Sequence, residues 1–163
     1  SVSSTCPVIT GPFSNMTGTM GSAGSTSSLT HEAISRNANT NSRKSTAITR
    51  NGGALEDVSE SVQQYALEID ANGLYSFKGT IGTDADKYIY ASSSSSNYMK
   101  VTSTLDDNGK FTIEIDSEGA ATIIAQGANT RNVMQYNNKS TSSPAFYCTN
   151  GSFGAVCLYK YFE

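Results

Sequence analysis

The side chains of this chain that could act as acids, bases or metal ligands are few. Its single histidine, His31, removes any multi-histidine metal site. A serine nucleophile would need that histidine as its general base and a Gly-x-Ser-x-Gly turn, which the sequence lacks. We therefore expect His31 to be an exposed structural residue, and we expect no catalytic residue, no metal and no cofactor.

Two clusters of side-chain oxygens could still do chemistry. Asp84 and Asp86 are two positions apart, so both could face one side of an extended segment, as in a glycosidase pair or a calcium site. The run Asp106-Asp107-Asn108 is a second cluster, but it lacks the later glutamate of an EF-hand. Asp and Asn also favour tight turns, and turn formation is the simpler interpretation of both clusters.

Tyrosine is the more suggestive residue type, with nine Tyr and no Trp. Tyr88 and Tyr90 flank a run of five serines together with Tyr98, and the first two share one face of a predicted strand. The simplest interpretation puts that face in the core, and the alternative is a surface that stacks on sugars. If a shallow ligand site exists, we expect it at Asp86, Asn97 and Tyr98, where an aromatic ring meets carboxylate and amide groups.

Two segments in the middle of the chain are near copies of one another. Gln64–Thr80 and Lys110–Gln126 each contain an alternating strand ending in Ile-Asp, a short turn with glycine at its last position, and a second alternating strand. Such self-similarity predicts that one supersecondary unit is reused along the chain. No segment has a comparable helical pattern.

Alternation and turn residues together predict eleven strands and an all-β fold. The expected strands lie near 32–36, 45–49, 63–70, 74–80, 87–91, 98–103, 110–116, 120–126, 132–136, 145–149 and 155–161. The spacing of their apolar centres, such as Ile34, Ile89 and Met134, is close to 45 residues and indicates three units of four strands.

The third unit lacks a fourth strand, because the chain ends shortly after the last predicted one. We expect the N-terminal segment Thr5–Phe13 to return beside the C-terminus and close a β-trefoil-like barrel. The alternative is a Greek-key β-sandwich. One domain is expected over residues 1–163, with residues 15–28, which are rich in Gly, Ser and Thr, as a mobile loop.

Charge and hydropathy argue against two partner classes. The formal net charge is −3, so we expect no binding to nucleic acid, and no apolar run is long enough for a transmembrane segment. The basic residues Arg36, Arg43, Lys44 and Arg50 are grouped, but no aromatic residue lies between them. They are expected to belong to a solvated loop and hairpin.

The cysteines fit neither a zinc site nor a redox motif. Cys148 and Cys157 flank a predicted turn and could form a disulfide across that hairpin. Two alternatives stay open: three buried free thiols, or a bridge from Cys6 to Cys157 that joins the two ends of the chain. Asn15, Asn138 and Asn150 match the glycosylation acceptor pattern, as expected by chance in so polar a chain.

Four segments together resemble a known module. They are Lys87–Lys100 (KYIYASSSSSNYMK), Lys110–Asp116 (KFTIEID), Ala121–Tyr136 (ATIIAQGANTRNVMQY) and Val156–Lys160 (VCLYK). The chain is similar here to a β-trefoil-like accessory module at the C-terminal end of secreted and surface proteins of Bacteroidetes, often after other extracellular domains or an endonuclease-like domain. Those modules open with a strong alternating strand, whereas here only residues 6–10 could form one. The resemblance implies an extracellular or cell-surface location and no catalytic residues.

These observations favour a non-catalytic extracellular module that binds a glycan or another cell-surface ligand such as a surface protein. The alternative is a structural or adhesive subunit, which would self-associate by exchange of the N-terminal segment between copies. A small hydrolase would depend on the paired carboxylates alone.

Overall fold

The computed structural model describes residues 7, 9, 11, 13, 16–23, 30–36, 39–51, 54–56, 60–137 and 144–160. Thirteen strands and two single-turn 3-10 helices make up its regular structure. The strands are β1 (Thr17–Ser22), β2 (Thr30–Ile34), β3 (Arg43–Asn51), β4 (Ala54–Glu56), β5 (Tyr65–Ile69), β6 (Tyr75–Gly79), β7 (Tyr88–Ala91), β8 (Met99–Thr102), β9 (Phe111–Ile115), β10 (Ala121–Ala125), β11 (Val133–Tyr136), β12 (Ala145–Thr149) and β13 (Val156–Lys160). The helices are η1 (Gly82–Asp84) and η2 (Asp107–Gly109).

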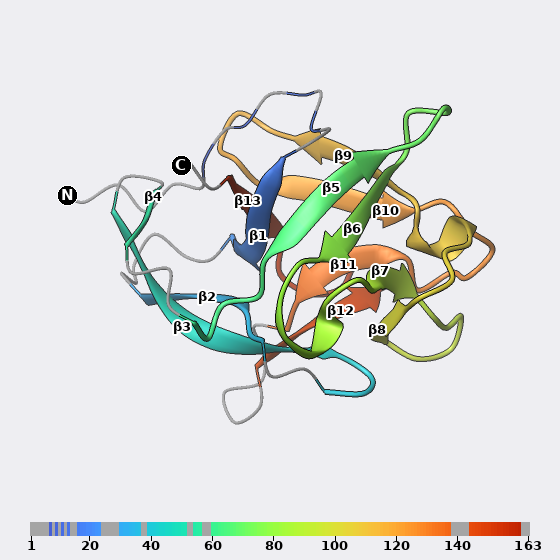
Figure 1. Cartoon of the computed structure of the whole chain (residues 1–163), viewed down its shortest axis with the longest axis horizontal. Coiled ribbons are helices and arrows are strands. Elements are labelled where there is room, and N and C mark those ends of the chain that lie inside the picture. The colour runs from blue at the N-terminus through green and yellow to red at the C-terminus, as the bar shows by residue number, and fades with distance from the viewer. Residues whose placement is uncertain are drawn as a thin grey trace.

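Six of the strands form a closed barrel. Antiparallel pairing runs from β1 to β5, β6, β9, β10 and β13, and then from β13 back to β1. Closure leaves none of these strands as a free edge. Figure 1 shows the barrel in the upper half of the molecule.

Three hairpins lie at one end of the barrel, below it in Figure 1. They are β2 with β3, β7 with β8, and β11 with β12. The chain therefore uses three units of four strands, β1-β2-β3-β5, β6-β7-β8-β9 and β10-β11-β12-β13, with β4 as a short addition to β3. Six barrel strands and three capping hairpins make a β-trefoil, as predicted, and not a Greek-key sandwich.

The strand that closes the barrel differs from the predicted one. It is β1, which lies within the segment 15–28 that we expected to be a mobile loop, and it pairs with β13 over five residues from Gly18↔Lys160 to Ser22↔Val156. The predicted strand 5–13 is described only at alternate residues. Of these, Phe13 is buried in the core, and its N–H donates to the hydroxyl of Tyr75 at 3.1 Å.

The sequence of β1, TGTMGS, hides its strand character because Met20 is its only large apolar residue. Its two glycines are required by close packing against β13. A Cβ on Gly18 would lie 1.9 Å from the carbonyl oxygen of Tyr159, and one on Gly21 would lie 2.7 Å from the ring of Tyr159. Low side-chain volume thus allows the ends of the barrel to meet.

The eleven predicted strands are all present, and each end lies within two residues of its predicted position. Besides β1, only β4 was not expected, because three residues are too few to show alternation. The two copied segments form β5–β6 and β9–β10 with the same register and the same turn. In each turn the aspartate Oδ1 accepts two backbone N–H groups, Asn72 and Leu74 on Asp70, and Glu118 and Ala120 on Asp116, at 2.8–3.0 Å.

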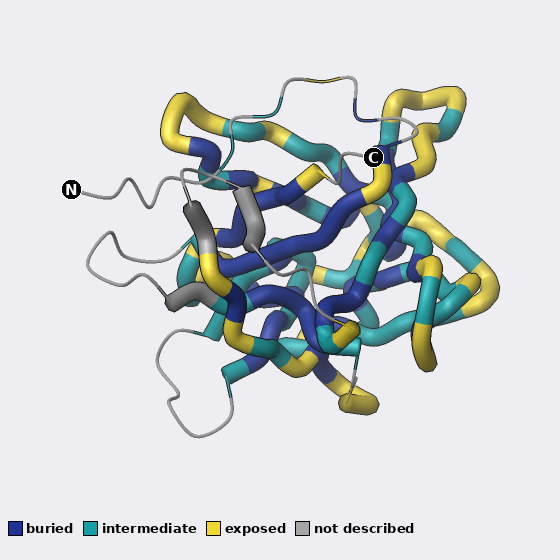
Figure 2. Tube along the Cα trace, turned by 60° about the vertical axis from the view of Figure 1, so that its left-hand side comes forward, coloured by how far each residue is buried: buried dark blue, intermediate teal, exposed yellow. Residues whose placement is uncertain are grey.

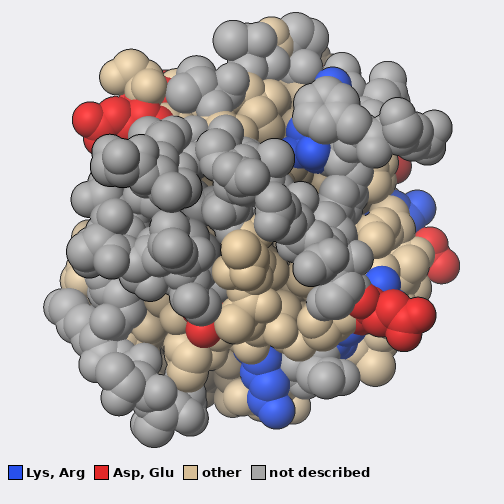
Figure 3. All heavy atoms as spheres, turned by 90° about the vertical axis from the view of Figure 1, so that its left-hand side faces the viewer, with Lys and Arg blue, Asp and Glu red and all other residues tan. Residues whose placement is uncertain are grey.

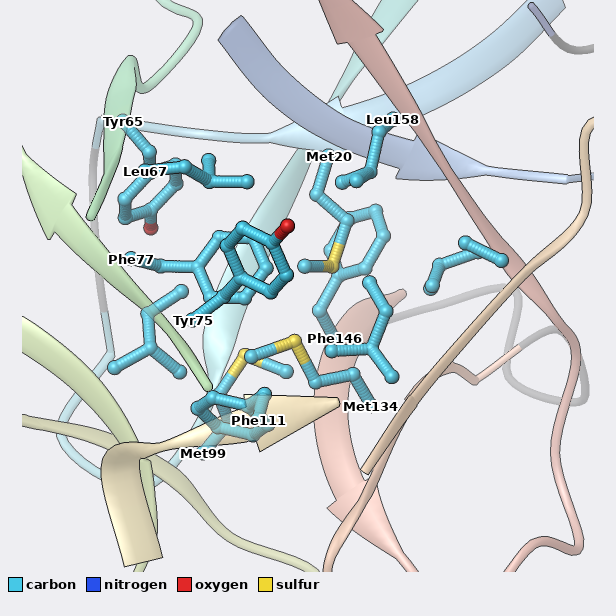
Figure 4. Packing of buried hydrophobic residues seen from close by; sticks show 14 of the residues in the cluster. Met20, Tyr65, Leu67, Tyr75, Phe77, Met99, Phe111, Met134, Phe146 and Leu158 are labelled. Atoms are coloured by element: carbon cyan, nitrogen blue, oxygen red, sulfur yellow. The ribbon is translucent and has the colours of Figure 1, made fainter. Parts of the chain in front are cut away.

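The core fills the barrel and the space between the hairpins. Buried residues follow the inner strands, and exposed ones gather at the turns (Figure 2). The predicted pseudo-equivalent residues Ile34, Ile89 and Met134 are all at most 1% exposed. Aromatic rings converge on the same centre, where Phe77 and Phe111 meet edge to face with their ring centroids 5.6 Å apart (Figure 4).

Candidate ligand-binding surface

The β7–β8 hairpin turns its aromatic side chains outward. Ile89, Ala91 and Met99 are fully buried, whereas Tyr88 and Tyr90 alternate with them and are half-buried. The expectation that the Tyr88–Tyr90 face belongs to the core is therefore wrong, because the small and aliphatic face of β7 packs inward instead. The tyrosine face is available to solvent.

Lysines accompany the tyrosines on this surface. Lys100 is paired across the hairpin with Tyr90, and its Nζ lies 5.1 Å from the centroid of the Tyr98 ring. Lys78 of β6 holds a similar position 5.8 Å from the Tyr88 ring. A hydrogen bond with Glu68 is the largest cause that raises the pKa of the Tyr88 hydroxyl, and desolvation by burial is the second. The hydroxyl therefore stays protonated and already has a partner.

The serine run beside this surface is held in place by the third unit. Ser94 accepts two hydrogen bonds from Thr130. Its Oγ accepts from the Thr130 N–H, and its carbonyl oxygen accepts from the Thr130 hydroxyl, both at 3.1 Å. The Asn129 amide donates to the carbonyl of Ala91 at 2.8 Å, and the Arg131 N–H donates to the carbonyl of Ser93 at 3.2 Å. Residues 92–97 are thus fixed against residues 129–131.

Asn97 and Tyr98, two of the predicted site residues, lie at this junction. The Nη1 of Arg131 donates to Oδ1 of Asn97 at 3.2 Å. The guanidinium therefore lies beside the residue that precedes Tyr98 in the chain. Arg131 and Lys100 are half-buried, and neither forms an ion pair within the part of the chain that the structure describes. Asn97, Tyr98, Lys100 and Arg131 are called the tyrosine-arginine junction below.

Asp86, the third predicted site residue, lies elsewhere. Tyr88 pairs with Thr102 at the open end of the hairpin and Ala91 pairs with Met99 near its loop, so Asp86 and Asn97 are at opposite ends. Three residues of strand separate those ends by about 10 Å. Asp86 is exposed and has a positive φ of 63°, which an aspartate in a turn tolerates. The structure therefore does not bring the three predicted residues together.

Asp84 does not face the same side as Asp86. It is 2% exposed, and its Oδ2 accepts from Nη1 of Arg43 at 2.6 Å. Arg43 is equally buried, donates from Nε to the carbonyl of Met99 at 3.2 Å and also donates to the carbonyl of Asn39. The predicted carboxylate pair is thus no acid–base site, and the prediction that Arg43 is solvated is wrong.

The other basic residues of that group differ among themselves. Lys44 is exposed, as predicted, whereas Arg36 is half-buried and donates from Nε to the carbonyl of Val62 at 3.2 Å. The side chains of Arg50 and His31 lie outside the described residues. On the face shown in Figure 3 the described acidic and basic side chains are scattered, and at the right of the view some of opposite charge lie side by side.

The second oxygen cluster is a turn. Oδ1 of Asp106 accepts from the N–H of Asn108 at 2.9 Å at the start of η2, and Oδ1 of Asn108 accepts from the N–H of Asn129 at 3.1 Å. This supports the turn interpretation and explains the side chains of Asp106 and Asn108 without a cation. Among the described residues no group of three His, Cys, Asp or Glu side chains could hold a metal ion.

Cys148 and Cys157 are not joined to one another, so the predicted hairpin disulfide is wrong. Cys148 is a free thiol in the main core, and burial raises its pKa, which disfavours the thiolate. Cys157 packs in a second cluster with Ala33, Ile48, Val62 and Tyr159. The two strands that carry these cysteines pair with other strands rather than with each other. Cys6 lies outside the described residues.

Of the three glycosylation motifs, only that of Asn150 lies in the described part of the chain. Asn150 is exposed, and its Oδ1 accepts from the hydroxyl of Ser152 at 2.9 Å. Asn15 and Asn138 lie outside it. The described residues contain no helix of the length and apolar character that spans a membrane.

Comparisons with known proteins bear on the fold. No protein-family model and no curated protein sequence matches this chain. A solved structure of a designed three-fold symmetric protein, ThreeFoil, is 16% identical with a TM-score of 0.56, over 87% of this chain and 96% of that one. The cytolethal distending toxin of Haemophilus ducreyi is 14% identical with a TM-score of 0.55, over 99% of this chain and 95% of that one. With the barrel of six strands and its three hairpins, these likenesses establish the fold as a β-trefoil.

Proposed function

We propose that this chain is a non-catalytic extracellular module that binds a glycan. The observation that carries the proposal is the outward tyrosine face of the β7–β8 hairpin beside a loop that is already ordered. Tyr90 and Tyr98 offer aromatic planes, and Asn97 and Arg131 offer hydrogen-bonding groups in the adjoining loop segments. Aromatic planes flanked by fixed polar groups suit sugars, whose rings have apolar faces and hydroxyl edges.

Order before binding supports a recognition role for this loop. Five hydrogen bonds link residues 91–94 to residues 129–131, so little conformational entropy is lost when a ligand binds. The absence of catalysis is proposed because the buried Asp84 is taken by Arg43 and the clustered Asp106 is taken by its own turn. The extracellular location rests on the sequence resemblance to secreted and surface proteins.

A glycan array tests this proposal directly. We expect the folded chain to bind a restricted set of glycans, and we expect Tyr98→Ala to weaken that binding about tenfold, the size of one lost aromatic contact. Tyr147→Ala is the matched control, because Tyr147 is a half-buried tyrosine on the hairpin of the third unit. A folded sample that binds nothing across a broad panel contradicts the proposal.

A structural or adhesive role by strand exchange is the second candidate. The observation that favours it is that β1, close to the N-terminus, closes the barrel through a five-residue ladder with β13 and contributes the buried Met20. The same ladder could form with the β13 of a second copy. Light scattering over a range of concentrations tests this, because exchange predicts dimers or larger assemblies, and a monomer at every concentration contradicts it.

A further inference from the structure

The charge of the tyrosine-arginine junction indicates which glycans it would bind. We infer that the junction selects sugars that carry an anionic group, a carboxylate or a sulfate, and that Arg131 and Lys100 recognise that group. This inference rests on the proposed function and adds the class of ligand to it.

Two cations contact neighbouring residues of this loop, Arg131 at Asn97 and Lys100 at Tyr98, and neither has an acidic partner among the described residues. The Nη1 of Arg131 is engaged by the neutral Oδ1 of Asn97, which leaves the charge of the guanidinium uncompensated and its remaining donors available. The ammonium of Lys100 lies over the Tyr98 ring, which attracts a cation but does not neutralise it. Half-burial of both side chains strengthens their attraction for an anion relative to a fully solvated charge.

The corresponding place between the first and second units shows what the junction lacks. There the hairpin of the first unit meets residues 80–87 of the second, and the Arg43 guanidinium is paired with Asp84. At the tyrosine-arginine junction the hairpin of the second unit meets residues 126–132 of the third, and the guanidinium meets an amide. In both places a guanidinium crosses between units, from the hairpin at Arg43 and toward the hairpin at Arg131, and only Arg43 meets a carboxylate.

The geometry suits a sugar better than a small free anion. An arginine fork binds a planar carboxylate or a sulfate through two donors, and we infer that Tyr98, the residue after Asn97, stacks on a sugar ring of the same ligand. Asn97 is held by Arg131 and adds an amide N–H₂ for a neighbouring hydroxyl. Such a site therefore recognises the anionic group and one face of the sugar ring at the same time.

Titration calorimetry with three related oligosaccharides tests the inference: an oligouronate, the same chain with its carboxylates reduced to alcohols, and a sulfated oligosaccharide. We expect the uronate or the sulfated chain to bind at least tenfold more tightly than the reduced chain, and we expect a fall in affinity as salt is raised. The two acidic arms separate a carboxylate ligand from a sulfate ligand.

Four variants, one of them a control, assign the effect to these residues. Arg131→Gln and Lys100→Gln are each expected to lower affinity for the acidic chain about tenfold and to leave the reduced chain unchanged, whereas Lys44→Gln, at an exposed lysine of β3, should change neither. Arg131→Lys keeps the charge without the fork and should fall between. Thermal unfolding of each variant confirms that the loop is intact.

The outcomes separate the inference from the proposed function. Equal binding of the acidic and the reduced oligosaccharides overturns the inference, and the module remains a glycan binder. Acidic preference that survives both Arg131→Gln and Lys100→Gln overturns the assignment to this junction. No binding of any of the three chains, with none on the glycan array, overturns both.

Discussion

The hairpin of the first unit differs from the other two in the residue that it sends into the core. Alignment of the cross-strand pairs Ile34↔Ser45, Ile89↔Val101 and Met134↔Cys148 makes Arg43, Met99 and Phe146 equivalent. All three are buried, but only Arg43 is charged. The second unit supplies the counter-charge, Asp84, from η1.

Charge in the first hairpin has to be matched by a specific neighbour, whereas methionine and phenylalanine are satisfied by packing alone. Tyr65, the first residue of β5, lies close enough to Arg43 and Asp84 to feel both charges. Burial raises the pKa of its hydroxyl, and the Asp84 carboxylate raises it further. The first hairpin therefore contacts the second unit through a polar pair of specific residues. The other two hairpins pack apolar residues at the same depth.

Removal of the counter-charge is expected to have the largest effect. Replacing Asp84 by Asn or Ala leaves the buried Arg43 guanidinium with its two carbonyl partners but without a counter-charge, and should lower the free energy of unfolding by about 3–5 kcal/mol. Chemical denaturation measures the loss. Asp86→Asn, two residues further along and exposed, is the matched control and should stay within about 0.5 kcal/mol of the parent chain. Equal effects of the two changes would refute the role given to the ion pair.

Making the first hairpin like the second should reverse most of that loss. The double variant Arg43→Met/Asp84→Ala removes both charges and gives β3 the residue that β8 has at the equivalent position. Because a buried ion pair replaced by apolar residues is often neutral in its effect, we expect this variant to regain about 2–4 kcal/mol over Asp84→Ala alone. A double variant no more stable than Asp84→Ala would mean that the hairpins differ in more than charge.

The packing of η1 against the barrel gives a smaller effect. Gly79 and Ala125 are equivalent, since they pair with Tyr65 and Phe111 in the two copied segments. A Cβ on Gly79 would lie 2.2 Å from the carbonyl oxygen of Asp84, so Gly79→Ala should cost about 1–3 kcal/mol by overpacking. The reverse change, Ala125→Gly, should cost about 1 kcal/mol or less. Calorimetric unfolding of the two variants shows whether the loss at Gly79 comes from a steric clash or whether any change between glycine and alanine at these equivalent positions costs as much.

Alternation in the sequence, together with the turn residues between strands, was enough to place the hairpins and the copied segments. It could not find β1, whose glycines carry no pattern. It also could not tell which face of β7 is inward, since Tyr88 and Tyr90 on one side and Ile89 and Ala91 on the other are both suited to a core. Burial of the aliphatic face decides this only in three dimensions.

The site was predicted in part for a related reason. Asn97 and Tyr98 are adjacent in sequence and were identified together, but Arg131 reaches Asn97 from the next unit, 34 residues away. Arg43 and Asp84 are likewise 41 residues apart, and neither has a local signal for burial. Only the threefold alignment, which puts Arg43 where Met99 and Phe146 stand, could have shown the mismatch before the structure.

The two copied turns allow the smallest and most selective test. Asp70 and Asp116 make the same two backbone hydrogen bonds, but Asp70 also lies 3.3 Å from the Nζ of Lys110, and no described lysine or arginine pairs with Asp116. The Leu74 N–H, then that of Asn72, and Lys110 lower the pKa of Asp70. Asp70→Asn should therefore destabilise the chain more than Asp116→Asn at neutral pH.

The pH dependence of that difference follows from the direction of the shift. A carboxylate whose folded pKa is lowered stabilises the fold at every pH above its unfolded pKa of about 3.9, and this contribution is lost as the pH falls through the folded value. The gap in unfolding free energy between the parent chain and Asp70→Asn should be constant from pH 7 to about 5 and should shrink below that. Urea denaturation across this range measures it. A gap that persists unchanged at pH 2 would mean that Asp70 acts through its turn geometry and not through its charge.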